Sequence, residues 1–260
     1  LFSEKFFLIF SISSEIPVAS SLPLLKQFNF TKSPSSIVVS RVFPTRFSLF
    51  EIKSDQIPTT IPIFPLDDVL LLPFGKLPLN IFEERYLKMA FDSLKSHRMI
   101  GIIQPKNNNN ELFMMGCVGK ITSFIETPDY RIVLNLEGVC RFILEERNLT
   151  TNGYYQANID CHNYLDDLNT MEPQIDRDSL ITKYESFFKL KKLEIDKNVL
   201  SDTSNLQLLS TLAMIAPFNK IDKQAILESP NLLSRVNTIS SILDLNTFQV
   251  LSRDNSNQLN

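Results

Sequence analysis

The 260-residue chain contains no tryptophan, only six glycines and only two histidines. It has neither a Gly-x-Gly-x-x-Gly dinucleotide-binding motif nor a Gly-x-Ser-x-Gly nucleophile elbow, so these two common signatures of enzymes are missing. The net charge of −3 lacks the basic excess that nucleic-acid-binding proteins use against phosphates. No apolar run reaches the roughly 18 residues of a membrane-spanning helix. We therefore expect no nucleic-acid partner and no membrane partner.

The three cysteines, Cys117, Cys140 and Cys161, are an odd number without Cys-x-x-Cys spacing. Such a set fits neither a disulfide framework nor a zinc knuckle and favours a reducing compartment. Cys117 and Cys140 lie in strand-like runs, where a thiol is usually a small buried hydrophobic group. Asp160, Cys161 and His162 are adjacent, and neighbours on a strand point to opposite faces. We expect no metal site and no cofactor.

Residues 1–55 differ from the rest of the chain, because they are rich in serine, contain no glycine and show no lasting apolar period. This segment is similar in part to a signal peptide and in part to a transit peptide. The alternative is upstream sequence translated in frame. We predict an unstructured leader, which is either a targeting segment or a mis-annotated one.

Residues 56–170 show a β-rich pattern of short branched and aromatic runs separated by turns. Tyr130, Ile132, Leu134 and Leu136 alternate with polar or smaller residues, as in a strand with one buried face. Turns are predicted at 127–129 and 152–153. One helix is predicted at 84–97, where Tyr86, Leu87, Ala90, Phe91 and Leu94 form an apolar stripe and His97 is expected as a cation at the helix end.

From residue 171 to residue 252 the apolar period changes to that of helices, which are predicted at 178–193, 206–216, 220–228 and 230–245. This segment is expected to form a helical subdomain. The polar residues 253–260 are predicted to be a frayed tail.

Candidate catalytic groups are few. The segment Gly116-Cys117-Val118-Gly119-Lys120-Ile121 departs from a phosphate-binding loop in its glycine spacing and in the isoleucine that replaces the hydroxyl residue. The adjacent acids Asp67-Asp68, Glu145-Glu146 and Asp166-Asp167 are predicted to be solvated. No catalytic residue is predicted, and the protein is not expected to be an enzyme.

Proline and large apolar residues are unusually dense between residues 61 and 86. Proline cannot donate to a strand ladder, so strands here must be short, at an edge or bulged. One interpretation is an exposed apolar surface for extended polypeptide. The other is that proline punctuates the strands of a small barrel.

Several ordered motifs resemble the N-terminal domain of the ATP-dependent protease Lon and the stand-alone bacterial proteins that consist of this domain. The resemblance covers about residues 58–250. The motifs read Pro62-x-Phe64-Pro65-Leu66, Leu77-Pro78-Leu79-x-Ile81-Phe82-Glu83-x-Arg85-Tyr86, Gly101-Ile102-Ile103-Gln104-Pro105, Leu136-Glu137-Gly138-x-x-Arg141-Phe142 and Lys223-Gln224-Ala225-Ile226-Leu227-Glu228.

The resemblance implies an α+β fold, in which a β-rich PUA-like pseudobarrel with one inserted helix precedes a C-terminal helical bundle. It also implies a non-catalytic, cytoplasmic polypeptide-binding module for unfolded or tagged protein, acting as an adaptor to a protease or chaperone in protein quality control. The chain lacks the ATPase and peptidase domains of Lon. An organellar or exported location applies if the leader is a targeting segment.

Four motif residues are the candidate polypeptide-binding site: Phe82, Glu83, Arg85 and Tyr86. A structural role is the competing interpretation, in which Arg85 pairs with a nearby acid and Tyr86 packs the helix. The alternative function is a PUA-like barrel that binds RNA or a small ligand, which predicts a local basic or aromatic-lined pocket.

Overall fold

The computed structural model describes residues 52–106, 111–169, 171–193 and 203–257. Most of the predicted leader therefore lies outside the described residues. The strands are β1 (Thr60–Pro65), β2 (Lys76–Ile81), β3 (Met99–Pro105), β4 (Leu112–Glu126), β5 (Ile132–Leu149) and β6 (Tyr155–Asp160). The helices are η3 (Ser54–Gln56), α2 (Glu84–Leu94), η4 (His162–Leu168), α3 (Arg177–Leu190), α5 (Asn205–Ile215), α6 (Lys220–Glu228) and α7 (Leu232–Asn257).

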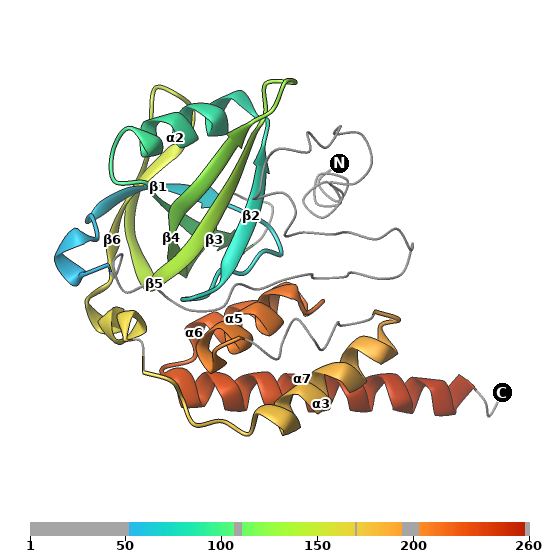
Figure 1. Cartoon of the computed structure of the whole chain (residues 1–260). Coiled ribbons are helices and arrows are strands. Elements are labelled where there is room, and N and C mark those ends of the chain that lie inside the picture. Colours follow the sequence, from blue (N-terminus) through green and yellow to red (C-terminus); the bar gives the residue numbers. More distant parts are fainter. Residues whose placement is uncertain (1–51, 107–110, 170, 194–202, 258–260) are drawn as a thin grey trace, which may run out of the picture.

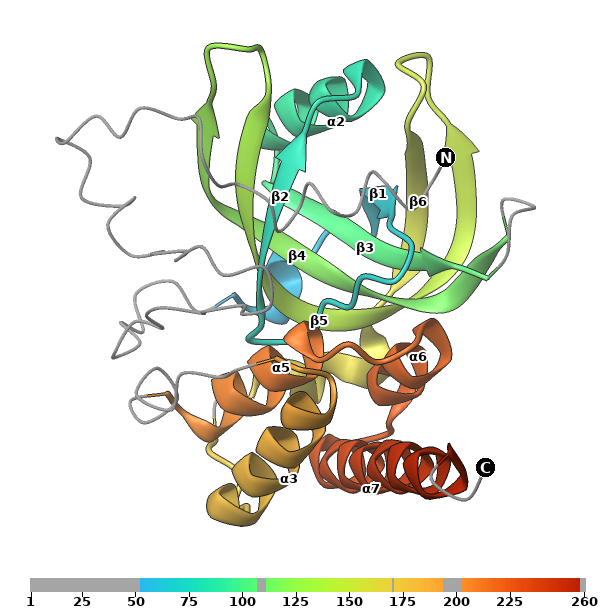
Figure 2. The ribbon, with the colours of Figure 1, turned by 90° about the vertical axis from the view of Figure 1, so that its right-hand side faces the viewer.

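The six strands form one mixed sheet in the order β2-β5-β4-β3-β1-β6, which an additional β5–β6 pairing closes on itself. The long strand β5 makes this closure possible, because residues 132–137 pair with β2 and residues 143–149 pair with β6. Only the β1–β3 pairing is parallel, and α2 lies on the connection between these two strands. The predicted α+β class is confirmed, and Figure 2 shows the strongly curved sheet.

The alternation predicted for β5 is confirmed from Ile132 onward, since Ile132, Leu134 and Leu136 are buried. Tyr130 departs from it and is 90% exposed. The reason is that residues 127–131 form a tight turn, in which the Thr127 N–H donates to the Arg131 carbonyl at 2.9 Å. Strand β5 therefore begins only after this turn, and Tyr130 lies at its tip.

Helix α2 buries Ala90 of the predicted apolar stripe and also Met89, which the prediction did not include, whereas Phe91 of the stripe is 40% exposed. His97 is not the predicted cation at the helix end. Its Nδ1 accepts a hydrogen bond from the Met99 N–H at 3.1 Å, which requires an unprotonated nitrogen, and burial lowers the pKa of His97.

The predicted helical region contains α3, α5, α6 and α7, which lie below the sheet in Figures 1 and 2. All four of these helices begin at a capping side chain, because Asp176, Ser204, Asn219 and Asn231 each accept a backbone N–H of the first turn. Helix α7 continues to Asn257, past the predicted helix end at residue 245 and into the segment for which fraying was expected.

Two groups of buried side chains hold the fold together. One group fills the space inside the curved sheet and includes Ile61, Val118 and Phe142. The other group is continuous from the outer face of the sheet to the helices, and it joins side chains such as Leu71 and Tyr184. The helices therefore share a core with the sheet.

The backbone at Gly138 meets the 66–75 connection so closely that a side chain does not fit. Its N–H donates to the Gly75 carbonyl at 2.8 Å, and its carbonyl accepts from the Phe74 N–H at 2.9 Å. A Cβ at residue 138 would lie 2.0 Å from the Leu72 carbonyl oxygen. Gly138 thus fixes the position of the segment that carries Leu71 into the shared core.

We expect Gly138→Ala to destabilise the fold by about 1–3 kcal/mol or more, because the methyl group must displace backbone. Gly153→Ala is the matched control, since its Cβ would meet nothing closer than 3.6 Å and only the positive φ of 83° opposes it. Urea unfolding of both variants measures the difference. Equal losses would contradict the steric argument.

A second prediction concerns pH. Folding lowers the pKa of His97. Protonation of this group therefore does not reduce the free energy of unfolding above the ordinary histidine pKa of about 6.5, and it reduces that free energy as the pH drops below this value. His97→Gln should remove this contribution, so the variant should lose less stability than the parent between pH 7.5 and pH 5. Urea unfolding at both pH values tests this, and an identical loss in the two proteins would refute it.

Candidate functional site

The four candidate residues lie together where β2 ends and α2 begins. Phe82 directly follows the last residue of β2, and Glu83 precedes the first residue of α2. The Glu83 carbonyl accepts the N–H groups of Tyr86 and Leu87, both at 2.9 Å, which starts the helix at this point. The local turn thus brings the side chains of this motif to one end of the sheet.

Arg85 pairs with Glu83, as the structural interpretation predicted. Its Nη2 and Nε donate to Glu83 Oε2 at 3.0 Å and 3.3 Å, and its guanidinium lies 4.6 Å from the centre of the Tyr86 ring. Half of the Arg85 side chain is exposed, so this ion pair contributes little to stability. It orients both charged groups at the rim of the site.

Tyr86 packs as predicted. Its ring centre lies 4.2 Å from that of Phe64 of β1, and burial raises the pKa of its hydroxyl. Tyr86 therefore holds the start of α2 on the sheet.

Phe82 is the candidate that projects into solvent, with 40% of its surface exposed. The Arg131 guanidinium lies 5.9 Å from the centre of the Phe82 ring and pairs with Asp129 at 2.7 Å. This contact brings the turn between β4 and β5 next to the β2–α2 junction.

Three exposed apolar residues missed by the sequence analysis lie at the same end of the sheet: Phe124 at 42%, Ile125 at 38% and Tyr130 at 90%. The strand register places them there, because Ile132 of β5 pairs with Ile81 on one side and with Glu126 on the other. Phe124 and Ile125 are neighbours on β4 and point to opposite faces of the sheet. Together with Phe82 they form what we call the tip surface. It lies at the end of the sheet opposite α3 and α5–α7 (Figure 2).

The turn that carries Tyr130 is closely held. The Tyr130 N–H donates to the Thr127 carbonyl at 3.0 Å, and the Thr127 hydroxyl oxygen accepts the Arg131 N–H at 3.2 Å. Tyr130 has a φ of 62°, a left-handed conformation that is costly for a residue with a side chain. The turn therefore keeps an aromatic ring in solvent under backbone strain.

The proline-rich segment 61–86 is not the exposed surface that one interpretation predicted. Its large apolar residues are mostly buried, and Leu70, Leu71 and Leu72 are no more than 2% exposed. The helices cover them, since these leucines belong to the core shared by sheet and helices. The observed burial agrees with the other interpretation, in which the prolines only interrupt the short strands of a small barrel.

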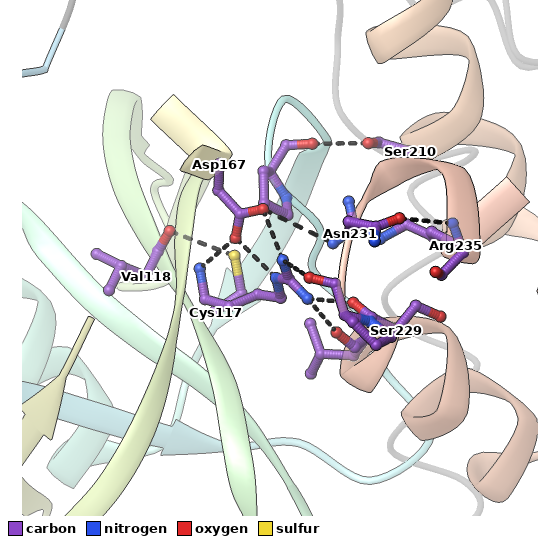
Figure 3. A network of polar contacts seen from close by, with 12 residues as sticks. Cys117, Val118, Asp167, Ser210, Ser229, Asn231 and Arg235 are labelled. Atoms are coloured by element: carbon purple, nitrogen blue, oxygen red, sulfur yellow. Dashed lines mark hydrogen bonds and ion pairs between the residues drawn. The ribbon is translucent and has the colours of Figure 1, made fainter. Parts of the chain in front are cut away.

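A buried charge network ties the sheet to the helices (Figure 3). Arg141 of β5 donates from Nε and Nη2 to the two oxygens of Asp167 at 2.7 Å and 3.0 Å. Its Nη1 donates to the carbonyls of Leu227 and Ser229, and Nη2 also reaches the Pro230 carbonyl at 3.4 Å. One side chain therefore positions both η4 and the connection between α6 and α7.

Asp167 is not the solvated acid that was predicted, because its side chain is only 8% exposed. It also lies 3.8 Å from the Arg235 guanidinium of α7. Burial, followed by the charge of Arg141, lowers the pKa of Arg235 to about 10. Asp167 thus lies between two buried guanidinium groups.

Asp67 and Asp68 are solvated in part, as predicted, with 46% and 53% of their side chains exposed, and they also pair with helix α6. Lys220 lies 2.5 Å from the Asp67 carboxylate, and Lys223 lies 2.9 Å from that of Asp68. Lys223 is itself buried and also donates to the Asp68 carbonyl at 2.7 Å. These pairs hold the 66–75 connection on the helices.

The described residues contain no group of three or more His, Cys, Asp or Glu side chains that could hold a metal ion. The Cys117 thiol donates to the Val118 carbonyl at 3.6 Å, and burial raises its pKa. None of the described helices combines the length and the apolar character that crossing a bilayer requires.

Comparison with known proteins gives a consistent picture. The family described as the ATP-dependent protease La (LON) substrate-binding domain matches residues 60–244. The Lon protease of Buchnera aphidicola from Acyrthosiphon pisum is 29% identical over 196 residues, which cover 71% of this chain and 25% of that protein. The Lon protease of Escherichia coli K12 is 24% identical over 197 residues, covering 71% of this chain and 24% of that protein.

Among solved structures, a Lon N-terminal domain protein from Xanthomonas campestris is similar, with a TM-score of 0.51 and 21% identity. The match covers 72% of this chain and 98% of that one, and it supports the fold. The present chain spans about a quarter of the length of the curated relatives that it matches.

We expect Asp167→Asn to destabilise the fold by about 3–5 kcal/mol, because two buried guanidinium groups lose their shared counter-charge. Asp166→Asn is the matched control. Asp166 is exposed, and its replacement should change stability by less than about 0.5 kcal/mol. Chemical unfolding of both variants compares them, and a loss below about 1 kcal/mol for Asp167→Asn would show that the network is dispensable.

Proposed function

The chain belongs to the family of ATP-dependent protease La (LON) substrate-binding domains, and from this membership we propose that it is a non-catalytic module that binds polypeptide substrates. The observation that carries the proposal is the tip surface, where Phe82, Phe124, Ile125 and Tyr130 are exposed together at one end of the sheet. Exposed apolar clusters on folded proteins commonly mark sites of interaction with other chains.

The chemistry of the tip surface suits unfolded or otherwise exposed polypeptide. Aromatic side chains provide large contact areas and dominate the energetics of many protein interfaces. The neighbouring charges are paired, Arg131 with Asp129 and Arg85 with Glu83, so the rim favours no strongly charged partner. We propose that Phe82 and Tyr130 make the main contacts and that Glu83, Arg85 and Tyr86 maintain the shape of the junction.

We propose that the protein binds polypeptide through side-chain contacts rather than by adding a strand of the substrate to its sheet. Among the described strands, β2 pairs only with β5 and has an edge to which a strand could add. The Gly138 N–H donates to the Gly75 carbonyl, so the backbone of residue 75 faces β5. In an antiparallel pair, alternate residues face the neighbouring strand, so the backbone of Pro78 faces the open edge of β2. Proline has no N–H to offer an added strand there.

The fold subtype and the biological role are part of the same proposal. The ring of strand pairings supports a PUA-like pseudobarrel, and the four helices beneath it support a C-terminal helical bundle. Since the curated relatives are Lon proteases of about four times the matched length, we propose an adaptor role in protein quality control, with a protease or chaperone as the partner. The cytoplasmic location stays a prediction.

The alternative function, binding of RNA or a small ligand, predicted a local basic or aromatic-lined pocket. The two arginines at the tip surface are each paired with an acid, which does not favour a basic pocket. Exposed aromatic residues suit either function, and the family match favours polypeptide substrates. We therefore keep polypeptide binding as the proposed function.

Binding of a fluorescein-labelled, reduced and carboxymethylated α-lactalbumin to the full chain tests this function by fluorescence anisotropy. The double variant Phe82→Ser, Tyr130→Asn should raise the Kd at least about tenfold, because large aromatic contacts carry much of the energy of an interface. Asparagine suits the left-handed backbone at residue 130, so this replacement should preserve the turn.

Leu149→Ser, Leu233→Ser is the matched control, because both leucines are exposed apolar residues outside the tip surface, at 63% and 68%. This control should bind as the parent does. Unchanged binding by the tip variant, or equal weakening in the control, would reject the tip surface as the site. Arg85→Ala should change the Kd less than about threefold, since its exposed ion pair contributes little energy.

A further inference from the structure

The turn between β5 and β6 contains the only Asn-Gly pair in the sequence, Asn152-Gly153. The Gly153 N–H donates to the Thr150 carbonyl at 3.0 Å, and the Thr150 N–H donates to the Tyr154 carbonyl at 2.8 Å. Gly153 has a φ of 83°. This pattern matches the three-residue hairpin loop in which a left-handed residue follows a type I turn.

The Asn152 side chain is exposed and connects this turn to helix α2. Its Nδ2 donates to Asp92 Oδ2 at 3.1 Å, and the same carboxylate oxygen accepts the Tyr154 hydroxyl at 2.9 Å. Asp92 therefore ties the β5–β6 hairpin to α2 through two side chains. One of these two hydrogen bonds requires the side chain of Asn152 to be a neutral amide that can donate.

The glycine that follows makes this amide open to attack by the backbone. Glycine has no Cβ, so the Gly153 nitrogen can approach the Asn152 Cγ more closely than the nitrogen of another residue could, and the two atoms can close a five-membered ring. In the closed turn this nitrogen is hydrogen-bonded to Thr150, so the reaction requires the turn to open. Exposed loops open locally at a small cost in free energy.

We propose that Asn152 is a site of spontaneous deamidation, which loosens the β5–β6 hairpin from α2 as the protein ages. The Gly153 nitrogen bonds to the Asn152 Cγ and gives up its proton, and the side-chain nitrogen leaves as ammonia. The resulting succinimide takes up one water from the solvent, which breaks one of its two C–N bonds and leaves aspartate or isoaspartate. The net change is one amide and one water converted into one carboxylate and one ammonium ion.

Either product replaces the attraction between residue 152 and Asp92 by repulsion. A carboxylate has no N–H to donate, and two like charges at this distance oppose the contact between hairpin and helix. Asn148 provides an internal comparison, because it is exposed in the same hairpin but is followed by Leu149, whose side chain hinders the backbone nitrogen. The inference does not depend on polypeptide binding at the tip surface.

Incubation of the full chain at 37 °C and pH 8 for several weeks tests the proposal. Aliquots are digested with pepsin at low pH, and the peptides that contain Asn148 and Asn152 are identified by mass spectrometry. We expect Asn152 to become aspartate and isoaspartate, whereas Asn148 keeps its amide. A parallel aliquot kept unfolded in guanidinium chloride should react faster at Asn152, because no turn has to open.

Three variants separate the steps. Gly153→Ala should slow the conversion at least about tenfold, because a Cβ hinders the attacking nitrogen. Asp92→Ala should speed it roughly two- to fivefold, because the Asn152 amide is then released and the turn opens more often. Asn152→Asp, which carries the charge of the product, should melt roughly 1–4 °C below the parent.

Asn148→Asp is the matched control for that melting shift, since it adds the same charge to the hairpin away from Asp92. It should change the melting temperature by less than roughly 1 °C. The measurement on the parent protein does not depend on any variant folding. Native protein in which Asn152 keeps its amide over the period that converts the unfolded aliquot would overturn the proposal, and so would an Asn152→Asp variant that melts with the parent.

Discussion

The ion pair between Arg141 and Asp167 determines how the helices meet the sheet. A buried guanidinium is costly unless its N–H groups are all satisfied, and Arg141 meets this demand with one carboxylate and three backbone carbonyls. The carboxylate comes from η4, and the carbonyls come from the last turn of α6 and the connection between α6 and α7. Any other arrangement of these segments would leave a buried charge unpaired. The core shared by sheet and helices forms around this constraint.

The division of the molecule into two ends follows from the same constraint. At the helical end, the lysines of α6 hold Asp67 and Asp68, and Leu71 is packed under the helices. At the opposite end, the described part of the chain adds only α2 and the strand hairpins to the sheet, as Figure 1 shows. Among the described residues, no further layer covers the apolar side chains there. The tip surface is thus exposed because the helices pack against the other end of the sheet.

Local sequence signals predicted most of the elements, because they depend on near neighbours. The alternation in β5, the stripe of α2 and the helical period after residue 171 are patterns within a few residues. Burial of Asp167 and of Leu71 could not be predicted in this way. Each depends on a partner far along the chain, Arg141 for the acid and the helices for the leucine.

The candidate site was predicted in part for the same reason. Phe82, Glu83, Arg85 and Tyr86 form a contiguous motif, but Tyr130 lies at the same end of the sheet only through pairing between strands. Its left-handed backbone is an additional sign, since a strained aromatic residue in solvent costs free energy that a simple turn would avoid. Asparagine or glycine would suit that position better. A tyrosine kept there with 90% of its surface exposed is better explained by contact with another chain than by folding.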